Sequence, residues 1–222
     1  MPQEICDLDC RNIVSNGVAY EINNDMCSVT LSHVISKDAD ALVIPKTLLF
    51  HSRKLTVSSV DDGAFSGCNN LEYVVLPDSV KSIGYCAFYR CASLTWVHLP
   101  DGLEHLGDYA FYECNSLRTA IIPPNITALG DGMFYRDRSL EFVVFPDEMK
   151  LIGRYAFYGC TALRSAIIPE ELEVVRSHAF ADCKNLRYVD CPKTAILGND
   201  SFHGCPEPNP QSDGIMYDQS ED

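Results

Sequence analysis

Residues 87–100 read Ala-Phe-Tyr-Arg-Cys-Ala-Ser-Leu-Thr-Trp-Val-His-Leu-Pro, and this stretch contains the unit that decides the fold. Four of its residue types recur in a common register along the chain. Phenylalanine recurs every 23 residues and finally after 22, at Phe65, Phe88, Phe111, Phe134, Phe157, Phe180 and Phe202. Leucine and proline keep the same step at Leu71, Leu94, Leu117, Leu140, Leu163 and Leu186 and at Pro77, Pro100, Pro123, Pro146, Pro169 and Pro192. Cysteine keeps it at Cys68, Cys91, Cys114, Cys160 and Cys183, ends at Cys205, and is replaced by Asp137 in the fourth position. A fixed period of this length indicates a solenoid.

Each unit combines a strand with a turn. Residues 94–99 alternate apolar and other side chains, which is the period of a strand, and Pro100 ends the strand because it has no N–H to donate. Leu103 and Leu106 then point inward, and Gly107 permits a turn before the next Ala-Phe pair opens a short helical turn. One unit cannot bury its own apolar face, whereas stacked units form a continuous core. We therefore predict a solenoid of α/β or mostly β repeats, with a parallel sheet on one face and short helical turns on the other.

The repeat resembles a known family. The pattern Ala-Phe-x-x-Cys-x-x-Leu-x-x-Val-x-Leu-Pro, followed by an aliphatic residue and glycine, is similar to the BspA-like subfamily of leucine-rich repeats. The resemblance covers residues 60–205 and implies a leucine-rich-repeat solenoid of about six to seven coils. Residues 17–22, 43–45 and 54–57 look like that family's β-rich N-terminal cap, which we place at residues 1–59. The family is a broad set of binding and adhesion scaffolds without a common ligand, so the resemblance implies binding but no particular partner.

The bulk composition excludes some partners. The chain has 222 residues and a formal net charge of −14, so phosphate backbones and anionic lipid repel it, and we expect no nucleic-acid partner. Apolar runs fall short of the roughly 20 residues that span a bilayer, so we expect no membrane insertion. The first seven residues lack the basic and apolar regions of a secretory signal, which favours an intracellular protein, although the family resemblance also allows the cell surface. Residues 206–222 are proline-rich and acidic, and we expect a disordered tail there.

The repeated columns have structural interpretations. The phenylalanines are expected to stack in the core. Neighbouring column cysteines are near enough for disulfides, but parallel side chains in register favour buried free thiols, and a zinc site would need paired short spacings. We expect the Asp137 carboxylate to take over loop-capping hydrogen bonds, helped by Arg136 and Arg138. The tyrosines that follow phenylalanine are expected to pack along the convex edge: Tyr89, Tyr112, Tyr135 and Tyr158.

The outward positions of the strands point to a binding face. Residues that alternate with core positions must face away from the core. They form two ladders, the first Tyr73, Trp96, Thr119, Phe142, Ser165, Tyr188 and the second Val75, His98, Ile121, Val144, Ile167, Asp190. Solvated sheets carry polar residues at such positions, and large exposed apolar patches usually mark contact sites. Strand propensity alone would explain the aliphatic residues, but it explains the single tryptophan of the chain poorly.

We therefore predict one exposed patch with shallow hollows over Thr119 and Ser165, where small residues follow large ones. A third outward position places arginines along one edge of the patch. The candidate binding residues are Tyr73, Trp96, His98, Ile121, Phe142, Val144 and Tyr188, edged by Arg118, Arg164 and Arg187.

An enzyme is disfavoured by the same positions. His98 is the only histidine expected on the sheet face, its predicted neighbours Val75 and Ile121 are apolar, and Asp190 lies four coils away. No phosphate-binding loop or paired metal motif is recognisable, so we expect no cofactor and no metal. The leading hypothesis is a non-catalytic scaffold that binds a protein or peptide through its sheet face. The alternatives are a structural or adhesive surface protein that uses the repeats as a spacer, and self-association through the apolar face.

Overall fold

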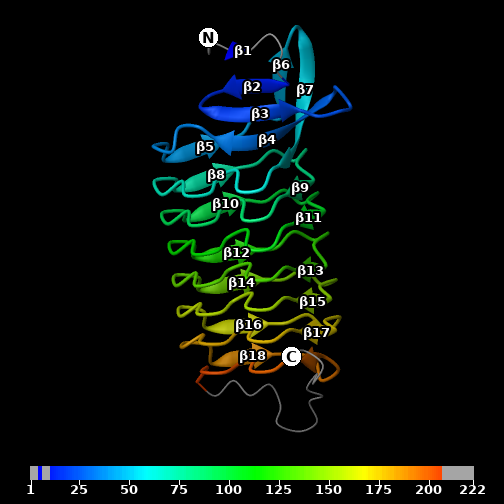
Figure 1. Cartoon of the computed structure of the whole chain (residues 1–222). Coiled ribbons are helices and arrows are strands. Elements are labelled where there is room, and N and C mark those ends of the chain that lie inside the picture. Colours follow the sequence, from blue (N-terminus) through cyan, green and yellow to red (C-terminus); the bar gives the residue numbers. More distant parts are fainter. Residues whose placement is uncertain (1–4, 7–10, 207–222) are drawn as a thin grey trace.

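The computed structural model describes the backbone of residues 5–6 and all of residues 11–206, and within these residues the chain forms one β-solenoid (Figure 1). The expected tail at 207–222 lies outside the described residues. The fold predicted from the repeat, a solenoid with parallel sheets, is confirmed. The described residues contain no helix, and therefore none that could cross a membrane.

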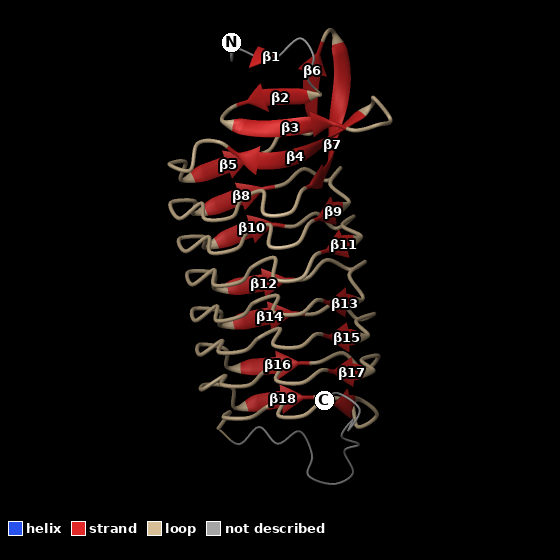
Figure 2. Cartoon of the chain, viewed as in Figure 1, coloured by secondary structure: helices blue, strands red, loops and turns tan. Residues whose placement is uncertain are grey.

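The N-terminal end is covered by antiparallel strands. β1 (Ile5–Cys6), β2 (Asn12–Ser15), β3 (Val18–Ile22) and β4 (Ser28–Val34) pair in sequence order, and β6 (Thr47–Phe50) forms a hairpin with β7 (Arg53–Val60). β4 pairs with β7 in parallel, and β7 pairs in parallel with β9 of the solenoid. The cap thus continues directly into the repeats and covers what would otherwise be an open core (Figure 2).

Two sheets run along the solenoid. The first contains β5 (Ala41–Val43), β8 (Tyr73–Val75), β10 (Trp96–His98), β12 (Thr119–Ile121), β14 (Phe142–Val144), β16 (Ser165–Ile167) and β18 (Tyr188–Asp190). The second contains β9 (Ser82–Ile83), β11 (His105–Leu106), β13 (Ala128–Leu129), β15 (Leu151–Ile152), β17 (Val174–Val175) and β19 (Ile196–Leu197). All pairs between neighbouring coils are parallel, as predicted, although the strands of the first sheet begin two residues after the column leucines.

The prediction of short helical turns on the face away from the parallel sheet is wrong. Each coil has left-handed backbone two residues before and two residues after its phenylalanine, with φ between 53° and 74°. These positions are Gly63, Cys86, Tyr109, Gly132, Tyr155, His178 and Asp200, then Gly67, Arg90, Glu113, Arg136, Gly159, Asp182 and Gly204. Left-handed residues interrupt an α-helix. The turn also directs its N–H groups to the next coil: Phe88 donates to the Ala110 carbonyl at 2.8 Å and Phe111 to the Met133 carbonyl at 3.0 Å.

The phenylalanine column forms the expected core. Adjacent rings stack nearly parallel, with centroids from 4.6 Å apart for Phe65–Phe88 to 5.4 Å apart for Phe111–Phe134. The six rings from Phe65 to Phe180 are at most 1% exposed, and Phe202 at the end of the stack is half-buried. The core is therefore one continuous column rather than a series of separate clusters.

The column cysteines Cys68, Cys91, Cys114, Cys160 and Cys183 are buried free thiols, as predicted, and Cys205 at the end of the column is half-buried. The Sγ of Cys91, Cys114, Cys160 and Cys183 donates to the carbonyl of the phenylalanine one coil earlier, at 3.0–3.1 Å. Burial raises the pKa of the Cys91 thiol to about 12 and raises those of Cys114 and Cys160 well above the ordinary value.

We expect these buried thiols to resist alkylation of the folded protein, because the reactive thiolate is suppressed by burial. Iodoacetamide at neutral pH, followed by peptide mass spectrometry, should label the exposed Cys27 first. Cys205 should follow, since it is only half-buried and the Cys183 thiol beside it lowers its pKa. Labelling of Cys91, Cys114 and Cys160 should require denaturant, and labelling of these three at the rate of Cys27 would contradict the prediction.

Asp137 occupies the cysteine position of its coil and is fully buried. Its Oδ1 accepts a 2.7 Å hydrogen bond from the Cys114 N–H, which confirms a loop-capping role. The prediction that Arg136 assists the Asp137 carboxylate is wrong. Its guanidinium lies instead over the Tyr135 ring and near the Glu113 carboxylate. Arg138 is exposed. Asp137 Oδ2 has no hydrogen-bond partner among the described residues, so the carboxyl is only half satisfied.

Candidate functional site

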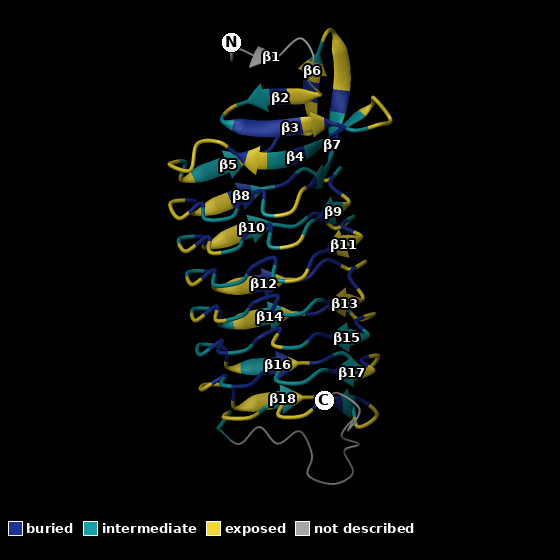
Figure 3. Cartoon of the chain, viewed as in Figure 1, coloured by how far each residue is buried: buried dark blue, intermediate teal, exposed yellow. Residues whose placement is uncertain are grey.

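The outward side chains of the first sheet are exposed where the sequence places them (Figure 3). In the first ladder the aromatic residues Tyr73, Trp96, Phe142 and Tyr188 are 44–57% exposed. In the second ladder the aliphatic residues Ile121, Val144 and Ile167 are 52–67% exposed, and His98 is half-buried. Strand register sets Trp96 beside Tyr73, Phe142 beside Thr119, and Tyr188 beside Ser165. Seven large apolar side chains therefore share one face of the solenoid.

The backbone beneath this face is interrupted at two steps. Its strands form three hydrogen-bonded groups, β5-β8-β10, β12-β14 and β16-β18, and Figure 1 shows the wider steps between them. At both interruptions a large outward residue precedes a small one, Trp96 before Thr119 and Phe142 before Ser165. The inward residue is also smaller after each interruption: Ala120 follows Val97 one coil later, and Ala166 follows Val143.

A hollow lies over Thr119, at the first interruption, as the alternation of large and small residues predicted. It has a volume of about 470 Å³. Val97 in β10 and Leu99 just after it occupy inward positions, but they are only half-buried because the open step to β12 leaves them uncovered. The hollow is lined by Trp96, Val97, His98, Leu99, Asp101, Thr119, Ile121, Ile122, Pro123 and Pro124. The hollow expected over Ser165 stays a prediction.

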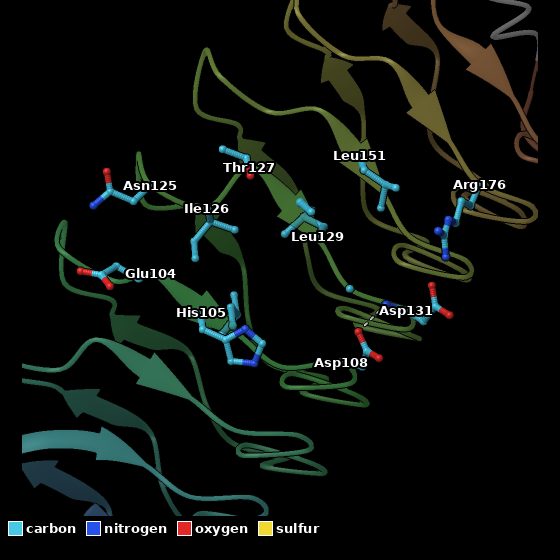
Figure 4. A pocket seen from close by; sticks show the side chains of 13 residues that line it. Glu104, His105, Asp108, Asn125, Ile126, Thr127, Leu129, Asp131, Leu151 and Arg176 are labelled. Atoms are coloured by element: carbon cyan, nitrogen blue, oxygen red, sulfur yellow. Dashed lines mark hydrogen bonds between the residues drawn. The ribbon is translucent and has the colours of Figure 1, made fainter.

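The second sheet is interrupted at the same step, between the coil of β10 and β11 and the coil of β12 and β13. β11 and β13 are not paired, and no backbone hydrogen bond joins residues 104–107 to residues 127–130 in the described chain. The resulting recess has a volume of about 330 Å³. Figure 4 shows Glu104, His105 and Asn125 along one side of it. At the end of the recess away from Asn125, the Asp131 N–H donates to Asp108 Oδ1 at 3.0 Å. Here the coils are joined mainly through their turns.

The arginines lie at the edge of the first sheet, just before the strands. Arg118 and Arg164 are exposed, and Arg164 lies 3.7 Å from the Glu141 carboxylate. Arg164, Asn185 and Arg187 line a shallow recess of about 320 Å³. The structure thus places two of the three predicted arginines around one recess. Arg118 stands two coils away from Arg164.

His98 has a polar neighbour that sequence reasoning missed. Its Nε2 lies 3.9 Å from Asp78 Oδ1, whereas we had expected only apolar neighbours. Asp78 follows Pro77 in the loop after β8, so strand alternation could not place it. The carboxylate is largely exposed, which makes this a weak surface contact. Among the described residues, no group of three or more His, Cys, Asp or Glu side chains is arranged to hold a metal ion.

The tyrosine column on the turn side packs against itself. Tyr89, Tyr112, Tyr135 and Tyr158 stack with centroids 4.7–5.0 Å apart, as the packing interpretation predicts. Arg90 lies over the Tyr89 ring, and the Tyr158 hydroxyl donates to Asp182. Because the stacked ring faces cover one another, this column offers less free apolar surface than the first sheet.

Comparison with known proteins agrees with this architecture. A family model described as BspA type leucine rich repeat region matches residues 50–163 and 129–209, with six copies of the repeat. The crystal structure of a T. pallidum leucine-rich-repeat protein (TpLRR) is 30% identical with a TM-score of 0.76, and the match covers 83% of this chain and 85% of that one. A Bacteroides ovatus leucine-rich-repeat protein is 25% identical with a TM-score of 0.69, covering 86% of this chain and 56% of that one. No curated protein matches the sequence.

Proposed function

Because the chain belongs to the BspA-type leucine-rich-repeat family, we propose that it is a non-catalytic scaffold that binds a protein or peptide through the first sheet. One observation supports this most strongly. Tyr73, Trp96, Phe142 and Tyr188 are each more than 40% exposed on one face, where a solvated sheet would carry polar residues. Contiguous exposed apolar surface marks contact sites in soluble proteins, and tryptophan and tyrosine are enriched among residues that dominate binding.

The geometry also suits binding better than catalysis. His98 is the histidine nearest the hollow over Thr119, and its charged neighbour Asp78 is exposed and 3.9 Å away. An acid–base group needs a partner within hydrogen-bond reach and an environment that tunes its pKa. The face instead combines aromatic anchors, a hollow and an arginine edge, which are the parts of a recognition surface.

Trp96→Ala combined with Phe142→Ala is expected to weaken partner binding by at least roughly thirtyfold, because central aromatic anchors typically contribute about 2 kcal/mol or more. Stability should change little, since both side chains are about half exposed. The measurement is quantitative mass spectrometry of proteins retained by the immobilised wild type and variant.

Tyr85→Ala is the matched control, because Tyr85 is 52% exposed but lies on the turn side. Proteins retained by wild type and by Tyr85→Ala, but lost from the double variant, are the expected result. If Trp96→Ala, Phe142→Ala and Tyr188→Ala all retain the same proteins as wild type, the sheet face is not the site. Light scattering of the purified chain distinguishes binding of another protein from self-association. A concentration-dependent dimer that Trp96→Ala abolishes would assign the face to a second copy of this chain.

A further inference from the structure

We infer that the partner of this face is an extended peptide segment with a bulky apolar side chain and, roughly six residues away, a carboxylate. The apolar side chain enters the hollow beside Trp96, and the carboxylate binds at the recess between Arg164 and Arg187. This inference rests on the proposed function, which it makes specific. The hollow and the arginine recess lie at different coils, so one side chain of a partner could not occupy both.

The hollow is built for an apolar group. Trp96, Ile121 and the consecutive prolines Pro123 and Pro124 supply apolar walls, and the half-buried Val97 and Leu99 lie at its base. Pro124 is the decisive difference from the other coils. The residue after the column proline is charged in every other coil, as Asp78, Asp101, Asp147, Glu170 and Lys193, but at this coil it is proline. Pro124 therefore replaces a charged side chain on one side of the hollow, while Asp101 remains among its lining residues.

The hollow is also large enough and offers backbone groups. Its volume of about 470 Å³ falls within the range of roughly 300–1,000 Å³ that is typical of ligand pockets. No backbone hydrogen bond joins β10 to β12 in the described chain, so the polar backbone groups at this step are available to a bound peptide. A peptide backbone offers both donors and acceptors to such groups, as a single apolar side chain would not.

The arginine recess selects a negative charge. The chain carries a net charge of −14, yet Arg164 and Arg187 line one recess together with Asn185. Among the described residues, one carboxylate is paired with this recess: Glu141 lies 3.7 Å from Arg164, which leaves a local excess of positive charge. Guanidinium groups bind carboxylates with two parallel hydrogen bonds, and Asn185 Nδ2, which already donates to the Thr161 carbonyl at 2.8 Å, has a second N–H to offer. A carboxylate is the complementary group.

The separation of the two halves sets the spacing in the peptide. The recess lies two to three coils beyond Thr119, about 10–14 Å at the usual spacing of strands. It lies at the beginning of the strands, whereas the hollow lies toward their ends, which adds about 13 Å along the strand direction. The oblique distance of roughly 18 Å corresponds to about six residues of extended chain at 3.3 Å each. The peptide therefore crosses the strands diagonally.

The test is selection of a random dodecapeptide phage library on the immobilised wild-type chain, followed by titration of synthetic selected peptides. The expected sequence class has a Leu, Phe, Met or Trp separated from an Asp or Glu by about five to seven positions. Trp96→Ala should weaken its binding by roughly thirtyfold. Arg164→Glu with Arg187→Glu should weaken it by about tenfold or more, and exchanging the peptide's acid for lysine should restore binding to that variant alone.

The matched control is Arg53→Glu with Lys54→Glu, which makes the same charge change at two exposed residues of the cap hairpin. That variant should bind the selected peptides as wild type does. Peptides that depend on Trp96 but show no acidic position, or no loss with the charge reversal, would overturn the inference and leave the sheet face as the binding site. Peptides unaffected by Trp96→Ala, Phe142→Ala and Tyr188→Ala would overturn both. Failure to enrich any sequence class would overturn the inference, while the proposed function is decided by the protein-retention experiment.

Discussion

Replacing Phe111 by alanine is expected to lower the free energy of unfolding by about 3–5 kcal/mol, the usual cost of removing a buried phenylalanine. Phe111 is fully buried and stacks on Phe88 at 5.1 Å and on Phe134 at 5.4 Å. The surroundings of Phe111 favour a large loss of stability. The first sheet is interrupted between β10 and β12, and the second between β11 and β13, so coils on either side of Phe111 rely on the core stack and on turn hydrogen bonds.

Urea unfolding followed by circular dichroism measures this loss. We also expect the variant to unfold over a broader range of denaturant, because the two halves of the solenoid become less strongly coupled across this step. Phe202→Ala is the control, since Phe202 is half-buried at the end of the stack and should cost much less. A cost for Phe111→Ala no greater than that for Phe202→Ala would show that the ring stack does not hold the two halves together.

Much of this architecture could be predicted from the sequence because a solenoid repeats each contact. Once Phe88, Cys91 and Leu94 are found in register with the same residue types in at least five other coils, their burial follows from stacking alone. Strand alternation similarly predicts that Trp96 and Ile121 face outward, because a strand offers only two faces. The exposure of these residues required no knowledge of distant parts of the chain.

The remaining features depend on interactions between coils. The turns around Phe88 read as helical in one unit, but their N–H groups donate to the following coil, and this hydrogen bonding cannot be recognised from local preference. The contact between His98 and Asp78 arises in a loop, where alternation has no meaning. The interruption after β10 did leave a signal in the sequence: Val97 is followed one coil later by Ala120, and Trp96 by Thr119. Together, the smaller inward residue and the smaller outward residue predict that the sheet is interrupted between β10 and β12.

Asp137→Asn is expected to stabilise the protein, increasingly so as the pH rises. Burial raises the pKa of the Asp137 carboxyl well above its ordinary value; the hydrogen bond from the Cys114 N–H opposes this shift and the nearby Glu113 carboxylate adds to it. The native protein therefore keeps a proton on this group at pH values where the unfolded chain, with a pKa of about 3.9, has lost it. In the other coils the column thiol donates to the phenylalanine carbonyl one coil earlier, and the equivalent acceptor for position 137 is the Phe111 carbonyl.

The pH dependence follows from proton linkage. Between pH 4 and the native pKa, the native state binds one more proton than the unfolded state, so wild-type stability falls by about 1.4 kcal/mol per pH unit. The contribution is fully present below pH 4 and is lost as the pH rises through the native pKa. Asparagine mimics the protonated carboxyl without titrating, so the stability difference between Asp137→Asn and wild type should be near zero at pH 4 and grow as the pH rises. Urea unfolding at each pH measures this difference.

Asp147→Asn, at an exposed carboxylate ten residues later, should show no such growth. Asp137→Cys, which restores the column thiol, should behave as Asp137→Asn does. Parallel curves for wild type and Asp137→Asn would mean that the buried carboxyl is charged in the native state and stabilised by groups other than those found around it.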